Sequence, residues 1–272
     1  PPYFRAQMKH IHRIQLSQIQ SSLKRGKSIL LLGPRQTGKT TLVKSLKHDR
    51  YLNLMNAEDR LRYEANPSAI IHEARALKEE LRVKPIIIID EIQKIPQLTD
   101  SLQIIIDEEI GQCILTGSSA RRIKNLLPGR VIKFQLDPLS LEEIEPKKDV
   151  IEDLLIYGSL PAIYMMDNES FKEQELESYV TLYLEEEIRK EALVRNLGSF
   201  RNFLRLASIE SGSLVSFRNI SHELGVHHST ISEYYRILQD CMLIEKIEPL
   251  TTSSTRKKLT KSPKYIMFDL GV

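Results

Sequence analysis

The sequence predicts an α/β protein whose first half forms five parallel strands with helices between them. Short apolar runs alternate with stretches of helical periodicity as far as residue 136, which is typical of a parallel sheet with helical crossovers. Two of these runs, Ile29–Leu32 and Ile86–Ile89, are followed at once by residues suited to binding a ligand. Because ligands bind at the carboxyl ends of parallel strands, we expect a site at that edge of the sheet.

The first apolar run leads into a segment that fits G-x-x-x-x-G-K-[ST] from Gly33 to Thr40. In such a loop the backbone N–H groups surround phosphate oxygens at the start of a helix. Lys39 adds a positive charge for the β- and γ-phosphates, and Thr40 offers a hydroxyl to Mg²⁺. We therefore predict a phosphate-binding loop. Its predicted binding residues are Gly33, Pro34, Arg35, Gln36, Thr37, Gly38, Lys39, Thr40 and Thr41.

The second apolar run ends in two adjacent carboxylates. Four isoleucines in a row favour a strand buried on both faces, and carboxylates at the end of such a strand are costly without a cation or substrate beside them. Asp90 fits the acid that holds Mg²⁺, and Glu91 fits the base that orients an attacking water. The alternative is a strand that simply ends in solvated acids.

A further strand is predicted at Gln112–Thr116, and it ends in Gly117-Ser118-Ser119. Small hydroxyl side chains there can contact a γ-phosphate or the attacking water, so Thr116 and Ser118 are candidate catalytic residues. The alternative is that these residues cap the helix that follows.

Arg130 precedes the fifth predicted strand, Val131–Leu136. An arginine in this place can act as a finger on the nucleotide of a neighbouring subunit. An exposed ion pair explains the same residue equally well.

Periodicity places the other elements of the first half. Helices are predicted at residues 9–25, 39–47, 58–65, 68–82 and 98–109, and further strands at residues 28–32 and 51–54.

After Pro138 the pattern becomes helical. Helices are predicted at Ser140–Glu145, 149–157 and Ser170–Ala192, with a turn at Tyr157–Pro161. The acidic run at residues 185–187 is interpreted as a solvated helix face rather than a metal site.

The last part of the chain has the layout of a helix-turn-helix followed by a basic hairpin. Helices at 199–210, Ser216–Leu224 and Ser229–Gln239 precede two paired strands, Leu243–Ile247 and Tyr265–Phe268. A basic wing between the strands could contact a DNA backbone. The alternative is packing against protein, because Arg236 is the sole permanent cation of the second helix.

Side chains at the start of that second helix also suit phosphate. Ser229 and Thr230 could bond a phosphate group, as could His227 and His228 when protonated. The adjacent histidines lack the spacing of a zinc pair.

Composition limits the class of protein. A chain of 272 residues is long enough for about two domains. The net charge of +3 is too small to indicate nucleic-acid binding by itself, so any basic patch must be local. Two distant cysteines and no apolar run of about 20 residues favour a reduced, cytoplasmic protein without a membrane span.

Several strings together carry a family resemblance. In order they are Gly33–Thr41, Ile89–Pro96, Leu115–Ser119, Leu127–Arg130, Pro138–Ser140, Tyr157–Pro161 and Pro263–Gly271. The chain resembles prokaryotic AAA-type P-loop ATPases in which the core precedes a C-terminal domain of unknown function. The resemblance implies an AAA-type core at residues 1–138, a helical lid at 139–196 and a winged-helix domain at 197–272.

The same resemblance implies ATP and Mg²⁺ as cofactors, with metal binding by Thr40 and Asp90. It implies catalytic roles for Glu91, Lys39, Arg130 and either Thr116 or Ser118. Members of the family continue beyond Asp-x-Gly, so Val272 is expected to end a truncated chain.

We therefore expect an ATPase that converts ATP and water to ADP and phosphate and is coupled to a winged helix. Met55 and Asn56 stand where the family usually has acids, which predicts slow turnover. The alternative is an ATP-switched regulator that binds DNA through residues 216–264 or binds a protein. A homo-oligomer with Arg130 acting in trans is a further expectation.

Overall fold

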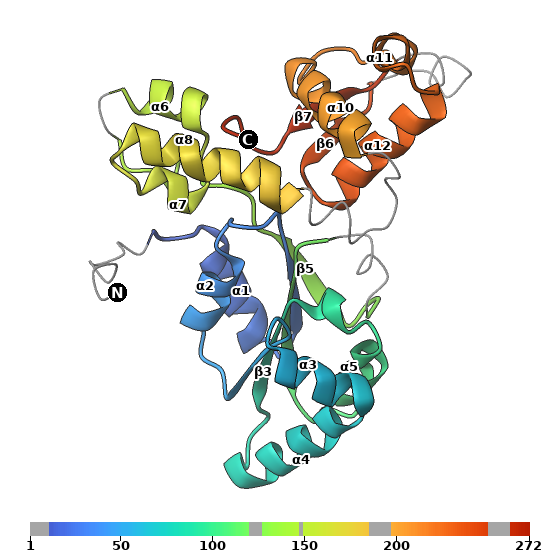
Figure 1. Cartoon of the computed structure of the whole chain (residues 1–272). Helices are drawn as coiled ribbons and strands as arrows, with labels where there is room; N and C mark the ends of the chain where they lie inside the picture. The colour runs from blue at the N-terminus through green and yellow to red at the C-terminus, as the bar shows by residue number, and fades with distance from the viewer. Residues whose placement is uncertain (1–10, 120–126, 147–148, 185–196, 250–261) are drawn as a thin grey trace. The chain divides into compact units, whose positions relative to one another are not determined.

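The computed structural model describes residues 11–119, 127–146, 149–184, 197–249 and 262–272. The chain divides into two compact units, Pro1–Lys148 and Asp149–Val272, whose elements are labelled in Figure 1. Among the described helices, none is long and apolar enough to cross a bilayer.

The first unit is built on a five-stranded sheet in which every pairing is parallel, as the sequence predicts. The strands are β1 (Ser28–Leu32), β2 (Arg50–Asn53), β3 (Ile86–Asp90), β4 (Gln112–Gly117) and β5 (Val131–Gln135). Their order across the sheet is β2-β3-β4-β1-β5. Strand β4 therefore lies between the strand that leads into the glycine-rich loop and the strand that ends in Asp90.

Helices cover both faces of this sheet (Figure 1). They are α1 (Gln15–Lys24), α2 (Lys39–Ser45), α3 (Ala57–Ala65), α4 (Ala69–Leu81) and α5 (Leu98–Asp107), with a short 3₁₀ turn η2 (Ile92–Lys94) after β3. Ile19 of α1 and Leu42 of α2 pack with alternate residues of β1, β3 and β4 in one buried cluster. Right-handed crossovers place α4 and α5 on the opposite face.

The burial of each strand depends on its position in the sheet. Every residue of β1 and β4 is buried, and Ile87, Ile88 and Ile89 of β3 are at most 1 % exposed. The edge strands β2 and β5 are largely half-exposed. The continuous isoleucine run thus marks an inner strand that is covered on both faces, as the sequence predicts.

The helix predicted at Ser140–Glu145 is absent. This segment forms a single turn in which the N–H of Glu143 donates to the carbonyl of Ser140 at 3.0 Å. The Glu143 carboxylate accepts from the Ser140 N–H at 3.0 Å, as at the start of a helix. Pro146 lacks an N–H and restricts the residue before it, so the turn does not continue as a helix.

The second unit is helical with one two-stranded hairpin. Its elements are α6 (Val150–Tyr157), α7 (Pro161–Tyr164), α8 (Glu169–Ser178), the π-helix η3 (Tyr179–Leu184), α10 (Leu197–Ile209), α11 (Phe217–Leu224), α12 (His228–Asp240), β6 (Ile244–Ile247) and β7 (Lys264–Met267). Strands β6 and β7 pair antiparallel, and Leu214 forms an isolated antiparallel bridge with Lys264.

One buried cluster runs through this unit from Tyr157 to Met267. Aromatic rings form its centre: Phe203 lies 5.1 Å from Tyr234 and 5.0 Å from Tyr235 between ring centroids. The helices of residues 149–184 and the helices α10 to α12 therefore share a single apolar core.

One sequence prediction in this unit needs amendment, and others fall on residues that the structure does not describe. Helix α8 ends at Ser178 and gives way to η3, where a single α-helix to Ala192 was predicted. The acidic run at residues 185–187 and most of the predicted basic wing, residues 251–261, lie outside the described residues. The three helices predicted between residues 199 and 239 are present, and the Ser216 hydroxyl caps α11.

A close backbone contact ties the turn after α6 to the segment after β7. The Asp269 carboxylate accepts from the N–H of Ser159 at 2.8 Å and from the N–H of Gly271 at 3.0 Å. Burial raises the pKa of Asp269, although these N–H groups oppose the shift. Gly158 has a φ of 74°, and a Cβ there would lie 1.8 Å from an Asp269 oxygen.

Replacing Gly158 by alanine should therefore destabilise the second unit. We expect Gly158→Ala to lower the free energy of unfolding by roughly 2 to 4 kcal/mol, since it combines a left-handed φ with a collision. Urea denaturation followed by circular dichroism measures the change. Gly212→Ala is the matched control, because Gly212 has a φ of 79° with open space around its Cβ position. Equal losses in the two variants would contradict the contact.

Candidate nucleotide-binding site

The predicted loop joins β1 to α2 at the carboxyl edge of the sheet. Gly38 has a φ of 92° and stands immediately before α2, where a Cβ would strain the backbone. The Lys39 ammonium is buried and donates to the carbonyls of Gly33 at 2.9 Å and Pro34 at 2.7 Å. These bonds hold the Lys39 ammonium against the loop, so its positive charge lies where phosphate is predicted to bind.

Gly33 is required by close packing. A Cβ at this position would lie 2.2 Å from the carbonyl oxygen of Leu136. The chain leaving β5 therefore crosses directly over the start of the loop, and only glycine leaves room for it.

Asp90 is the centre of the polar contacts at this edge. Its side chain is 2 % exposed. One carboxylate oxygen accepts from the Thr40 hydroxyl at 2.8 Å and from the Tyr51 hydroxyl at 2.7 Å. The other accepts from the Thr116 hydroxyl. Three hydroxyls from α2, β2 and β4 thus satisfy a carboxylate that would otherwise be buried at a high cost.

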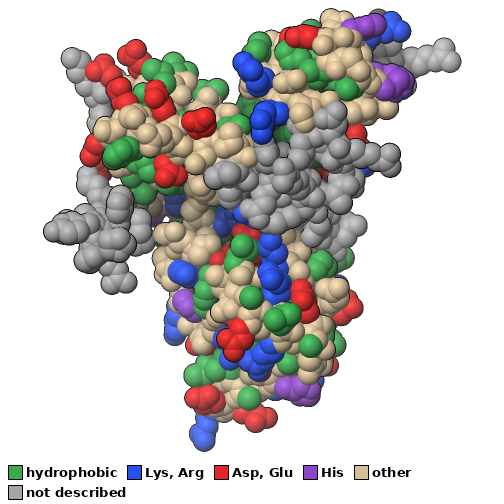
Figure 2. Space-filling view, in the orientation of Figure 1, with side chains coloured by type: hydrophobic (Ala, Val, Ile, Leu, Met, Phe, Trp, Pro, Cys, Tyr) green, Lys and Arg blue, Asp and Glu red, His purple; other side chains and the backbone are tan. Residues whose placement is uncertain are grey.

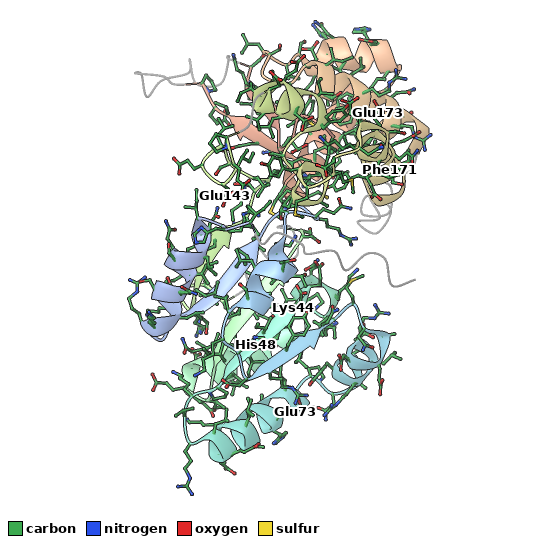
Figure 3. All side chains as sticks on the ribbon, turned by 90° about the vertical axis from the view of Figure 1, so that its left-hand side faces the viewer. Lys44, His48, Glu73, Glu143, Phe171 and Glu173 are labelled. Atoms are coloured by element: carbon green, nitrogen blue, oxygen red, sulfur yellow. The ribbon has the colours of Figure 1, made fainter. Side chains whose placement is uncertain are left out.

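Tyr51 was not singled out from the sequence. Burial raises the pKa of Tyr51, and its hydrogen bond to Asp90 adds to the shift, so the phenol stays a neutral donor. Its ring lies 4.6 Å from the Lys44 ammonium and 6.3 Å from the His48 ring centroid, and both neighbours are labelled in Figure 3. Pairing of β2 with β3 brings Tyr51 to Asp90, and nothing in the sequence around Tyr51 indicates that pairing.

Glu91 leaves the strand in a left-handed conformation with a φ of 64°. Its carboxylate accepts from the Ser118 hydroxyl at 3.2 Å and from the Gln93 side-chain amide. The same amide donates to the Ser118 oxygen at 2.9 Å. Backbone strain at a residue other than glycine is common at functional sites, and here it accompanies a carboxylate that two polar side chains hold in place.

The structure thus brings together most of the predicted site residues. Thr40, Asp90 and Thr116 form one hydrogen-bonded group, and Glu91 and Ser118 form another. Thr116 joins the two groups, since its hydroxyl oxygen also accepts from the Glu91 N–H at 3.1 Å. Gln93 belongs to the second group and was missed as a functional residue, although it lies within the string that carries the resemblance.

Arg130 does not join this site within its own chain. It immediately precedes β5, whose first residue pairs with Ser28 at the start of β1, so it lies at the amino edge of the sheet. Five residues of strand, roughly 16 Å, separate that edge from the loop. Its guanidinium pairs with Asp107 at 2.7 Å and 2.9 Å. The ion pair that the sequence left open is present, and a role in trans stays a prediction.

The donor set at the loop suits a hard divalent cation. Thr40 and Asp90 present oxygen atoms 2.8 Å apart beside the loop. Mg²⁺ is commonly held by one or two protein oxygens together with substrate phosphates and water. The residues present therefore fit Mg²⁺ arriving with a nucleotide.

Comparison with known families agrees with this geometry. Residues 25–145 match the family model described as AAA domain, which supports an AAA-type P-loop core in the first unit. Residues 148–272 match the model described as a domain of unknown function (DUF8612). The boundary between the two matches lies beside the boundary between the two compact units.

Individual relatives are distant. The uncharacterized proteins Rv2008c of Mycobacterium tuberculosis and Mb2031c of Mycobacterium bovis are each 24 % identical over 262 residues, which cover 94 % of this chain and 57 % of the relative. The chain therefore spans little more than half the length of these relatives.

Two solved structures are also similar. A STAND protein with a tetratricopeptide repeat sensor, PH0952 from Pyrococcus horikoshii, aligns with a TM-score of 0.40 and 16 % identity over 95 % of this chain and 41 % of that one. The Pif1 helicase from Candida albicans aligns with a TM-score of 0.34 and 14 % identity over 61 % of this chain and 47 % of that one. These scores are too low to define a shared fold.

The contacts of Asp90 predict an order of stability losses. Thr116→Val should cost about 2 kcal/mol, because it leaves a carboxylate oxygen of Asp90 and the Glu91 N–H without their shared partner. Tyr51→Phe should cost about 1 kcal/mol, because Thr40 still donates to the same oxygen. Urea denaturation of the two variants tests this order, and a larger loss for Tyr51→Phe would contradict it.

Proposed function

We propose that this chain binds ATP with Mg²⁺ at the carboxyl edge of its first unit and hydrolyses it to ADP and phosphate. The observation that carries the proposal is the convergence of Lys39, Thr40, Asp90 and Glu91 at one sheet edge. Each has the side chain that phosphoryl transfer to water requires: a cation for phosphate, two oxygens for the metal and a carboxylate for the water.

In this proposal, the loop N–H groups and Lys39 bind the phosphates. Thr40 and Asp90 would hold Mg²⁺, which would neutralise negative charge on the phosphates. Glu91 orients the attacking water and accepts its proton. Ser118 and Gln93 fix the direction of the Glu91 carboxylate, and Thr116 fixes Asp90.

The Glu91 assignment is tested by Glu91→Gln. We expect phosphate release from ATP to fall at least about a hundredfold, since loss of a general base typically costs this much. Binding of ATP should be retained, because the loop is unchanged. Glu108→Gln is the control, since Glu108 pairs with Arg75 on the surface. Equal phosphate release in Glu91→Gln and the unmodified protein would overturn the catalytic role.

Two observations favour a second candidate function, a nucleotide switch with slow turnover. Glu91 is already bound by two side chains, so water must compete for it. Asn56, where the resembling family usually has an acid, uses its side chain to cap α3 by accepting from the Glu58 N–H at 2.9 Å. In this version ATP occupancy, rather than its hydrolysis, controls what the second unit binds.

For the second unit we propose a winged helix that contacts DNA through residues 216–264. Helices α10 to α12, the hairpin β6–β7 and the Leu214–Lys264 bridge follow in the order of that fold. Asp and Glu side chains gather over α6 to α8, whereas Lys, Arg and His appear together with some acids over α10 to α12 (Figure 2). The exposed side chains of α12 include His228, Ser229 and Arg236.

Binding of duplex DNA should weaken as salt rises, because phosphate contacts release counterions. In fluorescence anisotropy, Arg236→Gln should raise the Kd severalfold and reduce the salt slope by about one. Arg75→Gln in the first unit is the control. Titrations with and without ATP separate a switch from constitutive binding. An affinity that ignores salt, or an unchanged slope in Arg236→Gln, would contradict the proposed contact.

A further inference from the structure

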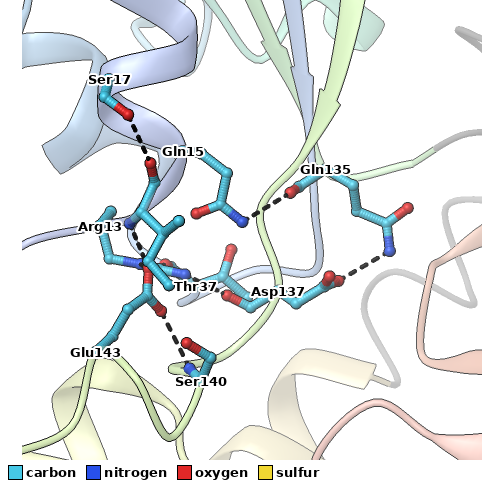
Figure 4. A network of polar contacts seen from close by, with 9 residues as sticks. Arg13, Gln15, Ser17, Thr37, Gln135, Asp137, Ser140 and Glu143 are labelled. Atoms are coloured by element: carbon cyan, nitrogen blue, oxygen red, sulfur yellow. Dashed lines mark hydrogen bonds and ion pairs between the residues drawn. The ribbon is translucent and has the colours of Figure 1, made fainter.

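Arg13 connects three distant segments of the first unit just before α1 (Figure 4). Its side chain is 8 % exposed. The guanidinium donates to the carbonyl of Thr37 at 2.5 Å, to the carbonyl of Asp137 at 2.6 Å and to the Glu143 carboxylate at 3.0 Å. One buried cation therefore joins the phosphate-binding loop to the chain that leaves β5.

Glu143 holds the arginine in this position. The Glu143 side chain is 2 % exposed and also accepts from the N–H groups of Ile14 at 2.8 Å and Ser140 at 3.0 Å. Burial would raise the pKa of Glu143, but these N–H groups and Arg13 outweigh it and lower the pKa. The carboxylate is thus charged and fully bonded, and the guanidinium next to it has a fixed orientation.

The bond to Thr37 acts on the peptide that faces the predicted ligand. In a trans peptide the C=O of one residue and the N–H of the next point in opposite directions. Because Arg13 holds the Thr37 carbonyl on its own side, the Gly38 N–H must point away from Arg13. The Thr37 hydroxyl donates to the Pro34 carbonyl at 2.9 Å, which fixes the neighbouring part of the loop.

The bond from Arg13 to the Asp137 carbonyl ties the loop to the chain that leaves β5. Leu136 lies against Gly33 with no room for a Cβ, and the next carbonyl, that of Asp137, is bound by Arg13. The loop is therefore held at both ends, at Gly33 by packing and at Thr37 by hydrogen bonding.

We propose that Arg13 is a positioning residue for polyphosphate: through Thr37 it orients the Gly38 N–H toward the phosphates. This inference rests on the proposed nucleotide site. It assigns Arg13 to the phosphates of the ligand and not to its base or ribose, because its hydrogen bonds are with the loop and with the chain after β5. A nucleotide and an inorganic polyphosphate should depend on Arg13 equally.

The test measures binding of ADP and of inorganic tripolyphosphate to the full chain by isothermal titration calorimetry. In Arg13→Met we expect the Kd of both ligands to rise at least about tenfold, which is typical for loss of a charge-assisted hydrogen bond. In Arg13→Lys, whose single ammonium cannot serve all three acceptors, we expect an intermediate rise for both. Arg13→Lys also decides the question if circular dichroism shows that Arg13→Met is unfolded.

Ile70→Val is the control for general loss of stability. Ile70 lies in α4, is 1 % exposed and belongs to the same unit, so its variant should melt earlier while both Kd values stay unchanged. Unchanged affinity in the Arg13 variants would overturn the inference, as would a weaker binding of ADP with tripolyphosphate unaffected. If the unmodified protein binds neither ligand, the proposed nucleotide site itself fails.

Discussion

The buried Asp90 carboxylate needs hydrogen-bond donors, and other segments of the first unit supply them. Isolated in an apolar sheet, such a group would be strongly destabilising. Hydroxyls from α2, β2 and β4 bond to it, and each comes from a different segment of the chain. Tyr51 of β2 and Thr116 of β4 reach Asp90 because their strands are the two neighbours of β3 in the sheet.

Much of the first unit could be predicted because its signals are local. A glycine-rich loop after an apolar strand and a row of isoleucines before two acids each specify an element and its end. Strand order, by contrast, depends on pairing between segments far apart in the sequence. Tyr51 and Arg13 escaped prediction for that reason: the partners of Arg13 lie 24 to 130 residues away. Gln93 lies within a motif that the sequence analysis singled out. Its contact with Glu91, however, depends on a backbone turn at Glu91 that composition does not reveal.

The turn at Ser140–Glu143 in the first unit and helix α8 in the second show the limits of local signals differently. Ser140 and Glu143 form the hydrogen bonds of a helix start, yet Pro146 stops the helix after one turn. The sequence predicts that α8 continues as one α-helix, yet the chain forms a π-helix from Tyr179. The Tyr179 side chain is buried in the shared core. The stop at Pro146 is a local effect of proline, whereas the change at Tyr179 coincides with burial in the shared core. The helices α6 to α8 and α10 to α12 share that core, so their packing is interdependent.

The alternation of side chains along β4 limits where residues can be inserted into this sheet. Thr116 lies in β4 between Leu115 and Gly117, and its side chain contacts Asp90. Inserting one residue into β4 would reverse that alternation and turn an apolar side chain toward Asp90. At the amino edge, where Arg130 and Asp107 pair near the surface, a longer connection adds little closure entropy. We therefore expect an insertion to be less disruptive at the amino edge of the sheet than within β4.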